Sequence, residues 1–222
     1  MPKSIVIIGK GPSVQRCTKE FINSFDEVAI CNHPVYDGYE HLISNHADYD
    51  FINVGDPNPY SQQRLQSLGI HTIINTGGRY IHNPPKSIVP DNCSVQYFPF
   101  YRGECLDYFK NQHQLDPSTG IMAFHYFVNK PEYSKIALVG FDLFEKGTPI
   151  YYFKKEEASP SLQYLWQRKS YDENNIITFD SGHNVKNTYH YLIEQIKKNL
   201  HTKFEMITNY PFDKTIDNLI IR

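Results

Sequence analysis

The stretch Ser4-Ile-Val-Ile-Ile-Gly-Lys-Gly-Pro-Ser13 joins a short apolar segment to a glycine turn. The apolar part, Ser4–Ile8, is rich in β-branched residues, which is typical of a strand buried on both faces of a parallel sheet. Gly9 and Gly11 have no Cβ atom, so the backbone can approach a ligand closely, and the Pro-Ser pair after them suits the start of a helix. Because a helix N-terminus favours an anion, the stretch predicts a phosphate site after the first strand.

The pattern Gly-x-Gly-Pro-Ser differs from both common phosphate-binding fingerprints. It lacks the third glycine of the dinucleotide-binding motif, and it lacks the Gly-Lys-Ser/Thr of the P-loop. Taken alone, the turn leaves two interpretations open. It is either a nucleotide site or a tight strand-to-helix turn without a ligand.

Composition narrows the class of protein. A chain of 222 residues suits one α/β domain, which we place over 1–222. A net charge of −2 gives no basic surface for duplex nucleic acid, so we expect no nucleic-acid partner. No segment approaches the roughly 20 apolar residues of a membrane span, and the N-terminus does not resemble a signal peptide, so we expect a cytoplasmic protein. The cysteines are scattered without the spacing of a zinc site or a disulfide framework, at Cys17, Cys31, Cys93 and Cys105.

Apolar segments alternate with helix-length stretches along the chain. Strands are expected at Ser4–Ile8, Glu27–Cys31, Tyr49–Val54, His71–Asn75, Ser94–Phe98, Lys135–Val139 and Ile176–Phe179. Helices are expected at Val14–Asn23, Ser61–Ser67, Gly120–Asn129, Leu162–Tyr171 and Val185–Asn199. This alternation predicts an α/β fold, Rossmann-like, with a doubly wound and mainly parallel sheet. Two segments rich in turn residues, Gly77–Asn92 and Gly147–Pro160, are expected to form lid loops.

Polar residues follow several of these strands directly. In an open parallel sheet the ligand lies at the carboxyl ends of the strands, so these residues are candidates for a binding site. Asn32 and Asn53 can donate and accept hydrogen bonds, and Asp142 is expected to be hydrogen-bonded because a buried carboxylate is costly without partners. The segment Ser118-Thr-Gly120 predicts the start of a second helix, with a hydroxyl side chain as its N-cap.

His183 is the candidate general base. It follows the expected strand Ile176–Phe179 within Asp180-Ser-Gly-His183, and imidazole accepts a proton near neutral pH. His183 and His190 lie seven residues apart without a convincing carboxylate partner, so we expect no metal site. The chain also has no Gly-x-Ser-x-Gly elbow, so a hydrolytic triad is not indicated.

Taken in chain order, these motifs resemble the bacterial sialyltransferases of glycosyltransferase family 42, of the Campylobacter type. The resemblance rests on Gly9-Lys-Gly-Pro-Ser13, Cys31-Asn32, Asn53, Ser118-Thr-Gly120, Gly140-Phe-Asp142, Gly182-His183 and Lys186-Asn-Thr188, which span most of the chain. It implies a Rossmann-like fold, a GT-A-like variant, that binds CMP-sialic acid. It also implies direct, inverting and metal-independent transfer of the sugar to a glycan.

The resemblance also implies roles for individual residues. His183 would deprotonate the acceptor hydroxyl. The donor-binding candidates are Gly9, Lys10, Gly11, Pro12, Ser13, Asn32, Asn53, Ser118, Thr119, Gly120, Asp142 and Phe144. Two positions depart from the family: Lys10 stands where an Asn is usual, and Phe144 replaces the first of two tyrosines that stabilise the leaving CMP. Tyr151 or Tyr152 lies close enough in sequence to supply the second tyrosine.

The sequence leaves two alternatives beside sialyl transfer. One is an enzyme of the flagellin-glycosylation or pterin-pyrophosphokinase-like group. The other is a catalytically silent nucleotide-sugar or glycan-binding module, which the loss of a phenol at Phe144 favours. The expected partners are a CMP-activated sugar and a glycan or glycolipid acceptor, such as a lipooligosaccharide. Peripheral association with the inner face of the membrane through that acceptor, and a homo-oligomer, stay open.

Overall fold

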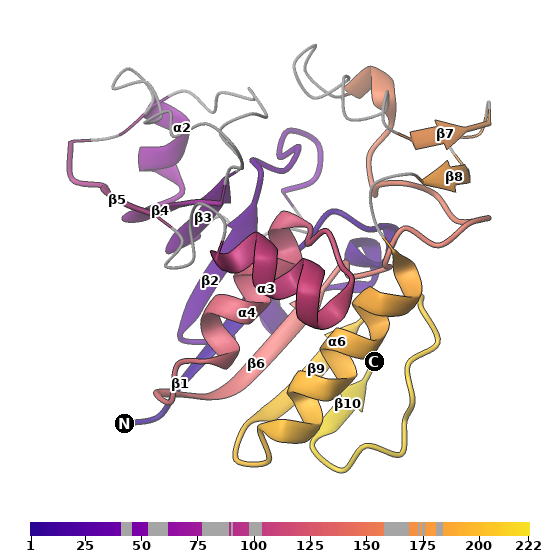
Figure 1. Cartoon of the computed structure of the whole chain (residues 1–222). Helices are drawn as coiled ribbons and strands as arrows, with labels where there is room; N and C mark the ends of the chain where they lie inside the picture. Colours follow the sequence, from indigo (N-terminus) through magenta and orange to yellow (C-terminus); the bar gives the residue numbers. More distant parts are fainter. Residues whose placement is uncertain are drawn as a thin grey trace.

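Eight parallel strands form the central sheet of the computed structural model, in the order β10-β9-β6-β1-β2-β3-β4-β5 (Figure 1). The structure describes residues 1–40, 46–52, 62–76, 89, 91–97, 104–157, 169–172, 174, 176–180 and 184–222. The strands are β1 (Lys3–Ile8), β2 (Glu27–Cys31), β3 (Tyr49–Ile52), β4 (Thr72–Asn75), β5 (Ser94–Tyr97), β6 (Tyr133–Val139), β9 (Lys203–Ile207) and β10 (Leu219–Ile221). The doubly wound parallel sheet predicted from the sequence is confirmed.

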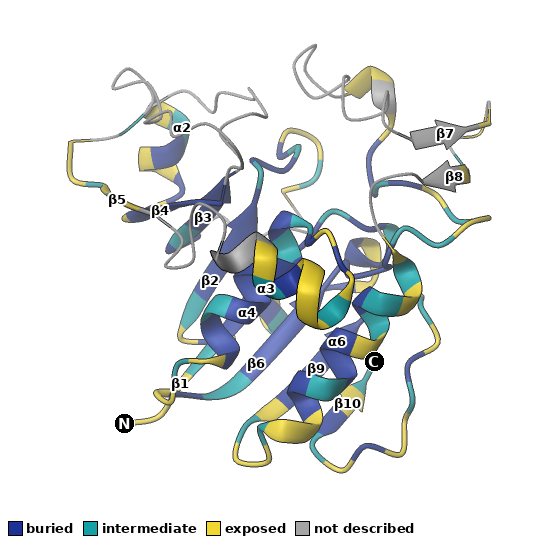
Figure 2. Cartoon of the chain, viewed as in Figure 1, coloured by how far each residue is buried: buried dark blue, intermediate teal, exposed yellow. Residues whose placement is uncertain are grey.

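Strand β1 shows why these segments become buried strands. Its side chains alternate between two apolar layers, with Ile5 and Ile7 facing one and Val6 and Ile8 facing the other. Both layers exclude water, so a strand between them needs apolar residues at every position. In Figure 2 the central strands are accordingly buried along most of their length, whereas α6 combines buried and exposed residues.

Helices cover the first face of the sheet and shorter elements cover the second. The first layer is completed by α3 (Glu104–His113), α4 (Thr119–Val128) and α6 (Val185–Lys198). The second is completed by η1 (Pro12–Arg16), α1 (Lys19–Ile22) and α2 (Gln62–Ser67), and a short 3-10 turn, η2 (Lys155–Glu157), follows later in the chain. The helix expected over Val14–Asn23 is therefore split in two, because Cys17 has extended backbone and Thr18 starts a new helix as its N-cap.

Two of the expected elements take another form. Strand β8 (Ile177–Asp180) does not join the main sheet but pairs antiparallel with β7 (Lys169–Tyr171) (Figure 1). Residues 169–171 were expected to end a helix over Leu162–Tyr171, and that prediction is wrong for them because their backbone pairs with β8 instead. The carboxyl-end argument for a parallel sheet consequently does not apply to β8.

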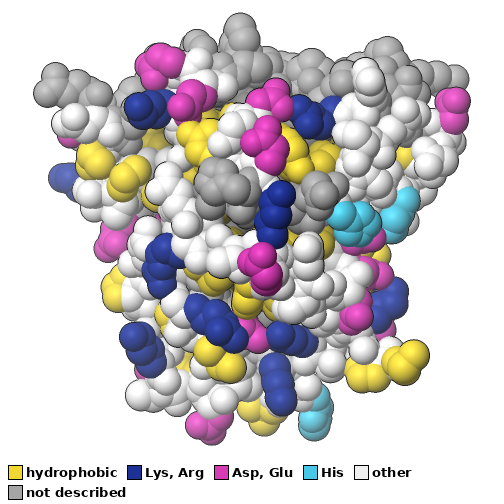
Figure 3. Space-filling view, turned by 180° about the vertical axis from the view of Figure 1, so that it is seen from behind, with side chains coloured by type: hydrophobic (Ala, Val, Ile, Leu, Met, Phe, Trp, Pro, Cys, Tyr) yellow, Lys and Arg dark blue, Asp and Glu magenta, His cyan; other side chains and the backbone are white. Residues whose placement is uncertain are grey.

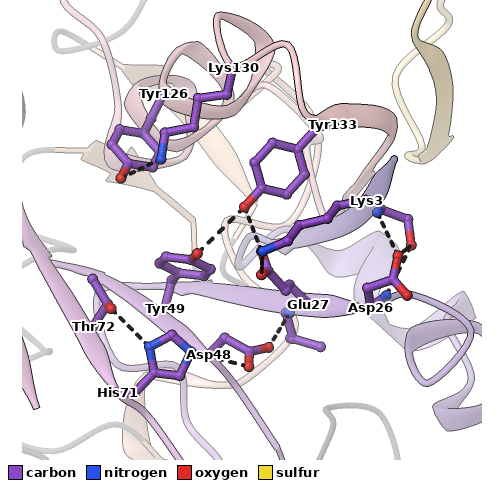
Figure 4. A network of polar contacts seen from close by, with 12 residues as sticks. Lys3, Asp26, Glu27, Asp48, Tyr49, His71, Thr72, Tyr126, Lys130 and Tyr133 are labelled. Carbon is purple, nitrogen blue, oxygen red and sulfur yellow. Dashed lines mark hydrogen bonds and ion pairs between the residues drawn. The ribbon is translucent and has the colours of Figure 1, made fainter. Parts of the chain in front are cut away.

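The amino ends of the strands are tied together by a polar network (Figure 4). The Glu27 carboxylate accepts hydrogen bonds from Lys3 Nζ at 2.6 Å and Tyr133 Oη at 2.5 Å. Burial raises the pKa of Glu27, but these hydrogen bonds, the charge of Lys3 and the nearby Tyr49 hydroxyl together leave the pKa below its usual value. The Asp48 carboxylate accepts a hydrogen bond from Val28 N at 2.7 Å. This edge therefore joins neighbouring strands through charged and polar side chains.

On the opposite face of the sheet from α6, charged side chains of both signs lie among each other (Figure 3). The buried Glu205 carboxylate of β9 lies 2.8 Å from Lys135 Nζ and 2.6 Å from Arg222 Nε. Lys135 also places its ammonium group 4.2 Å from the centre of the Phe25 ring. Ion pairs thus join β9 to its neighbours β6 and the end of β10 on this face of the sheet.

Candidate functional site

The winding of the sheet reverses between β1 and β6, which lie side by side. From β1 the chain moves outward through β2, β3, β4 and β5, whereas β9 and β10 extend the sheet beyond β6. Ligands of open parallel sheets bind at the carboxyl ends of the strands that flank such a reversal. The turns that follow these two strands, 9–13 and 140–144, are therefore the centre of the candidate site.

These two turns pack directly against each other. Gly9 N donates to Val139 O at 2.7 Å, and Gly11 N donates to Gly140 O at 2.9 Å. A Cβ atom on Gly11 would lie 2.6 Å from Gly140 O and 2.4 Å from Asp142 Oδ2, closer than real Cβ contacts allow. The glycines are thus required by the contact between the two turns, in addition to any approach of a ligand.

Asp142 occupies the start of η1. Its Oδ2 accepts a hydrogen bond from Ser13 N at 2.8 Å, and its Oδ1 accepts one from Asn209 N at 2.6 Å. The expectation that this buried carboxylate is hydrogen-bonded is confirmed, and its partners are these two backbone amides and the Thr208 hydroxyl. Pro12 has no N–H group and Val14 N donates to Gly11 O, so the chain's own carboxylate takes the place expected for a ligand anion. Asp142 therefore holds the turn 9–13 against the segment at Asn209, and it also lines the hollow between the turns.

Three candidate residues are brought together beside these turns by a chain of hydrogen bonds. Lys10 Nζ donates to Asn32 O at 2.6 Å, and Asn32 Nδ2 donates to Thr119 Oγ1 at 2.9 Å. They come from the ends of β1 and β2 and from the start of α4, where Ser118 Oγ caps the helix by accepting from Ile121 N at 3.3 Å. Three of the donor-binding candidates, Lys10, Asn32 and Thr119, therefore lie together at the carboxyl edge.

A hollow of about 60 Å³ opens at this edge. Phe144 lines it, with a φ angle of 56°, and the preceding Leu143 has a φ angle of 57°. The other lining residues are Gly9, Lys10, Gly11, Gly120, Gly140, Phe141, Asp142, Leu143, Pro149 and Ile150. The described part of the hollow has room for only a few water molecules, so a nucleotide would extend from it along the edge of the sheet.

The two candidate tyrosines have different surroundings. Tyr152 is buried, its N donates to Lys10 O at 3.0 Å, and its hydroxyl donates to Val35 O. Tyr151 is half-buried and stacks on Phe153, with its ring centre 6.2 Å from that of Phe144. Tyr151 is therefore next to Phe144, which lines the hollow. Tyr152 instead links the backbone of Lys10 to that of Val35.

Other candidates have structural contacts or lie outside the described residues. Ser13 is fully buried and its hydroxyl donates to Ile207 O at 3.0 Å. Asn53 and His183 lie outside the described residues, as do 77–88, 90 and 158–160 of the two expected lid loops. Strand β8, which precedes His183, is joined to the loop after β6 because Ile177 N donates to Thr148 O at 2.8 Å. After His183, Asn184 caps α6 by accepting from Asn187 N at 2.9 Å.

A buried pair, His33 and Asp50, was not anticipated as part of this region. His33 directly follows Asn32, and its Nε2 contacts Oδ2 of Asp50 in β3. The sequence held one signal, because Asp50 is a charged residue inside the apolar run Tyr49–Ile52. The pair places a buried polar contact directly after Asn32.

No group of three or more His, Cys, Asp or Glu side chains in the described part of the chain could hold a metal ion. Within the same residues, no helix is both long enough and apolar enough to cross a membrane.

Comparison with solved structures identifies the fold. The chain is similar to the sialyltransferase CstII from Campylobacter jejuni, with a TM-score of 0.60 and 15% identity over 99% of this chain and 84% of that one. It is also similar to the α-2,3-sialyltransferase Cst-I from the same organism, with a TM-score of 0.58 and 16% identity over 98% and 82% of the two chains. A mammalian sialyltransferase matches with a TM-score of 0.51 and 14% identity over 91% and 69%.

This protein has the sialyltransferase fold. The fold expected from the sequence resemblance is thereby confirmed. At the level of sequence, neither a protein-family model nor a curated protein matches the chain.

Proposed function

We propose that this chain is an inverting glycosyltransferase that moves sialic acid, or a related acidic sugar, from a CMP-activated donor to a glycan hydroxyl. The observation that carries the proposal is the linked set of Lys10, Asn32 and Thr119 at the carboxyl edge of a sheet with the sialyltransferase fold. Solved structures of that fold contain CMP, the substrate analogue CMP-3FNeuAc, or a trisaccharide acceptor together with CMP. These complexes support a donor of the same class for this chain.

The proposed reaction assigns a task to each part of the site. Lys10 places a positive charge beside the hollow, where it can balance the charge of the donor phosphate. The acceptor oxygen attacks the anomeric carbon as the bond to CMP breaks, and His183 removes the proton from that oxygen. We assign the phenol near the leaving phosphate to Tyr151, because the Tyr152 hydroxyl already donates to Val35 O. The reaction as proposed needs no metal ion.

Ligand binding is the first test. CMP at millimolar concentration should raise the melting temperature, because a ligand that binds only the folded state stabilises it, whereas NAD and ATP should not. Incubation with CMP-sialic acid and a panel of galactosides should then release CMP and increase the glycan mass. Both changes should be equally large with and without EDTA. No thermal shift with CMP would remove the proposal, and loss of transfer in EDTA would remove its metal-independent form.

The assignment of His183 is tested by substitution. We expect His183→Ala to lower transfer by roughly 10²–10⁴-fold, with CMP affinity little changed, because only proton transfer is removed. The matched control is His190→Ala, an exposed histidine on α6 that should keep full activity. Full activity in the His183 variant would show that another group is the base.

One observation favours a second candidate function, a binding module without catalysis. Phe144 lines the hollow and has no hydroxyl to donate to a leaving phosphate. Such a module would bind CMP and release none from CMP-sialic acid with any glycan. The incubation above therefore separates it from the enzyme.

A further inference from the structure

The turn that presents Asn32 has an unfavourable backbone conformation. Asn32 and His33 follow β2 with φ angles of 52° and 44°, the left-handed region that residues other than glycine rarely adopt. Such a conformation persists only where the surroundings hold it in place. Asn and His adopt this region more readily than most residues, but two successive positions in it make contacts from outside the turn important for holding it.

Several contacts hold Asn32 itself. Asn32 N donates to Phe51 O at 2.8 Å, which extends the pairing of β2 and β3 beyond the end of β2. Its carbonyl oxygen accepts from Lys10 and its side-chain amide donates to Thr119. None of these contacts reaches the side chain of the next residue, His33.

His33 is held by Asp50. Its Nε2 contacts Asp50 Oδ2, and the side chains are 6% and 0% exposed. Asp50 lies in the middle of the sheet, paired in register with Ile30 on one side and Ile73 on the other. Apart from this ion pair, neither oxygen of the Asp50 carboxylate has a hydrogen-bond partner among the described residues.

This arrangement is costly for the fold alone. A buried carboxylate with one partner loses more hydration than a single contact restores, and replacing a buried ion pair by apolar side chains is often neutral or stabilising. The electrostatic effect of the carboxylate extends to its neighbours, since burial and then Asp50 raise the pKa of Cys31 to about 12. Because such a pair contributes little net stability, its role is better explained by the residues that it holds in position.

We propose that His33 and Asp50 are positioning residues for the nucleotide site, because their contact fixes the left-handed turn that directs Asn32 toward Thr119. This inference rests on the proposed function for its ligand, but its structural part concerns the turn alone. A displacement of Asn32 by about 1 Å would weaken recognition of a bound nucleotide substantially.

The test compares two substitutions of similar size at position 50. Asp50→Asn keeps an oxygen that can accept from the imidazole, and Asp50→Leu removes it. We expect the Asn variant to bind CMP within about threefold of the wild type, and the Leu variant to bind about tenfold more weakly or worse. In amide hydrogen exchange, the Asn32 N–H should stay protected in the Asn variant and lose protection in the Leu variant.

The double variant His33→Leu with Asp50→Leu separates positioning from stability. It should melt at or above the wild-type temperature and still bind CMP about tenfold more weakly. Tyr133→Phe, at the opposite edge of the sheet, is the matched control, because it should lower stability and leave CMP affinity unchanged. If the double variant does not fold, the comparison of the two single variants decides.

Each outcome bears on one of the two proposals. Unchanged Asn32 protection or equal CMP affinity in the Leu variant would overturn the positioning role. A wild-type protein that does not bind CMP would remove the proposed function. Loss of Asn32 protection in the Leu variant would still support the role of the pair in holding the turn.

Discussion

Single residues at the carboxyl edge serve the fold and the site together. The Asp142 carboxylate fills the place at the start of η1 where a ligand phosphate was expected, and it binds Ser13 and Asn209 through their backbone amides. The glycines and the helix start predicted an anion at this position, and the structure places the Asp142 carboxylate there, whereas the binding of a ligand phosphate stays a prediction. The polar side chains that we propose for ligand binding lie beside these contacts of Asp142. They are Lys10, Asn32 and Thr119.

Gly11 is the residue whose substitution tests this packing. Its φ angle is −66°, so alanine there meets no backbone penalty, but its Cβ atom would collide with Asp142 and Gly140. We expect Gly11→Ala to lower the free energy of unfolding by about 2–3 kcal/mol, the cost of overpacking. Urea unfolding measures the change.

Gly38→Ala is the matched control for that substitution. Gly38 has a φ angle of +87° and nothing lies within 4 Å of the position that a Cβ atom would take, so only the backbone penalty of about 1 kcal/mol applies. If the two variants lose equal stability, the two turns are not packed as tightly as the contacts indicate.

Helices α4 and α6 are joined by a buried histidine. A hydrogen bond joins His125 Nδ1 of α4 and Tyr191 Oη of α6. Burial, with the nearby His113, lowers the pKa of His125 to about 4. In the unfolded chain a histidine titrates near pH 6.5. The unfolded state therefore binds more protons between these values, so stability is complete above about pH 6.5 and falls as the pH drops toward 4.

This titration predicts a measurable loss of stability in acid. Between pH 7.5 and pH 4.5 the protonation of His125 should lower the free energy of unfolding by about 2–3 kcal/mol. Urea unfolding at several pH values measures this change. His125→Gln cannot titrate and should show a smaller loss over that interval. His201→Gln, at an exposed position, should keep the wild-type loss. An equal loss in all three proteins would show that other groups cause the acid sensitivity.

The alternation of apolar segments predicted the sheet because strands buried on both faces leave a signal in every residue. It missed β9, whose sequence Lys203-Phe-Glu-Met-Ile207 contains a glutamate. That glutamate reads as solvent-facing, yet Glu205 is buried because Lys135 and Arg222 neutralise it from neighbouring strands. Other contacts also could not be predicted, because their partners are distant in the sequence. They include the contacts of Gly11 with Asp142 and of His33 with Asp50.

Across the whole molecule, the two edges of the sheet carry different kinds of polar residues. At the amino edge, Glu27, Lys3 and Tyr133 bind one another (Figure 4). At the carboxyl edge, the reversal between β1 and β6 leaves polar groups beside a hollow. A parallel sheet places its ligand at the carboxyl edge, so the amino edge is expected to serve stability alone.

Hydrogen exchange with and without CMP tests that division. Because a bound nucleotide suppresses local opening around it, CMP should slow amide exchange in 9–15, 32–36, 118–122 and 140–152. The amides of Glu27, Tyr49 and Tyr133, at the amino edge, should exchange at unchanged rates, apart from any uniform slowing through global stability. UMP at the same concentration is the control for the base, and weaker protection with UMP would show that the edge reads the cytosine. Protection centred on the amino edge would place the nucleotide at the wrong end of the sheet and contradict the site built from Lys10, Asn32 and Thr119.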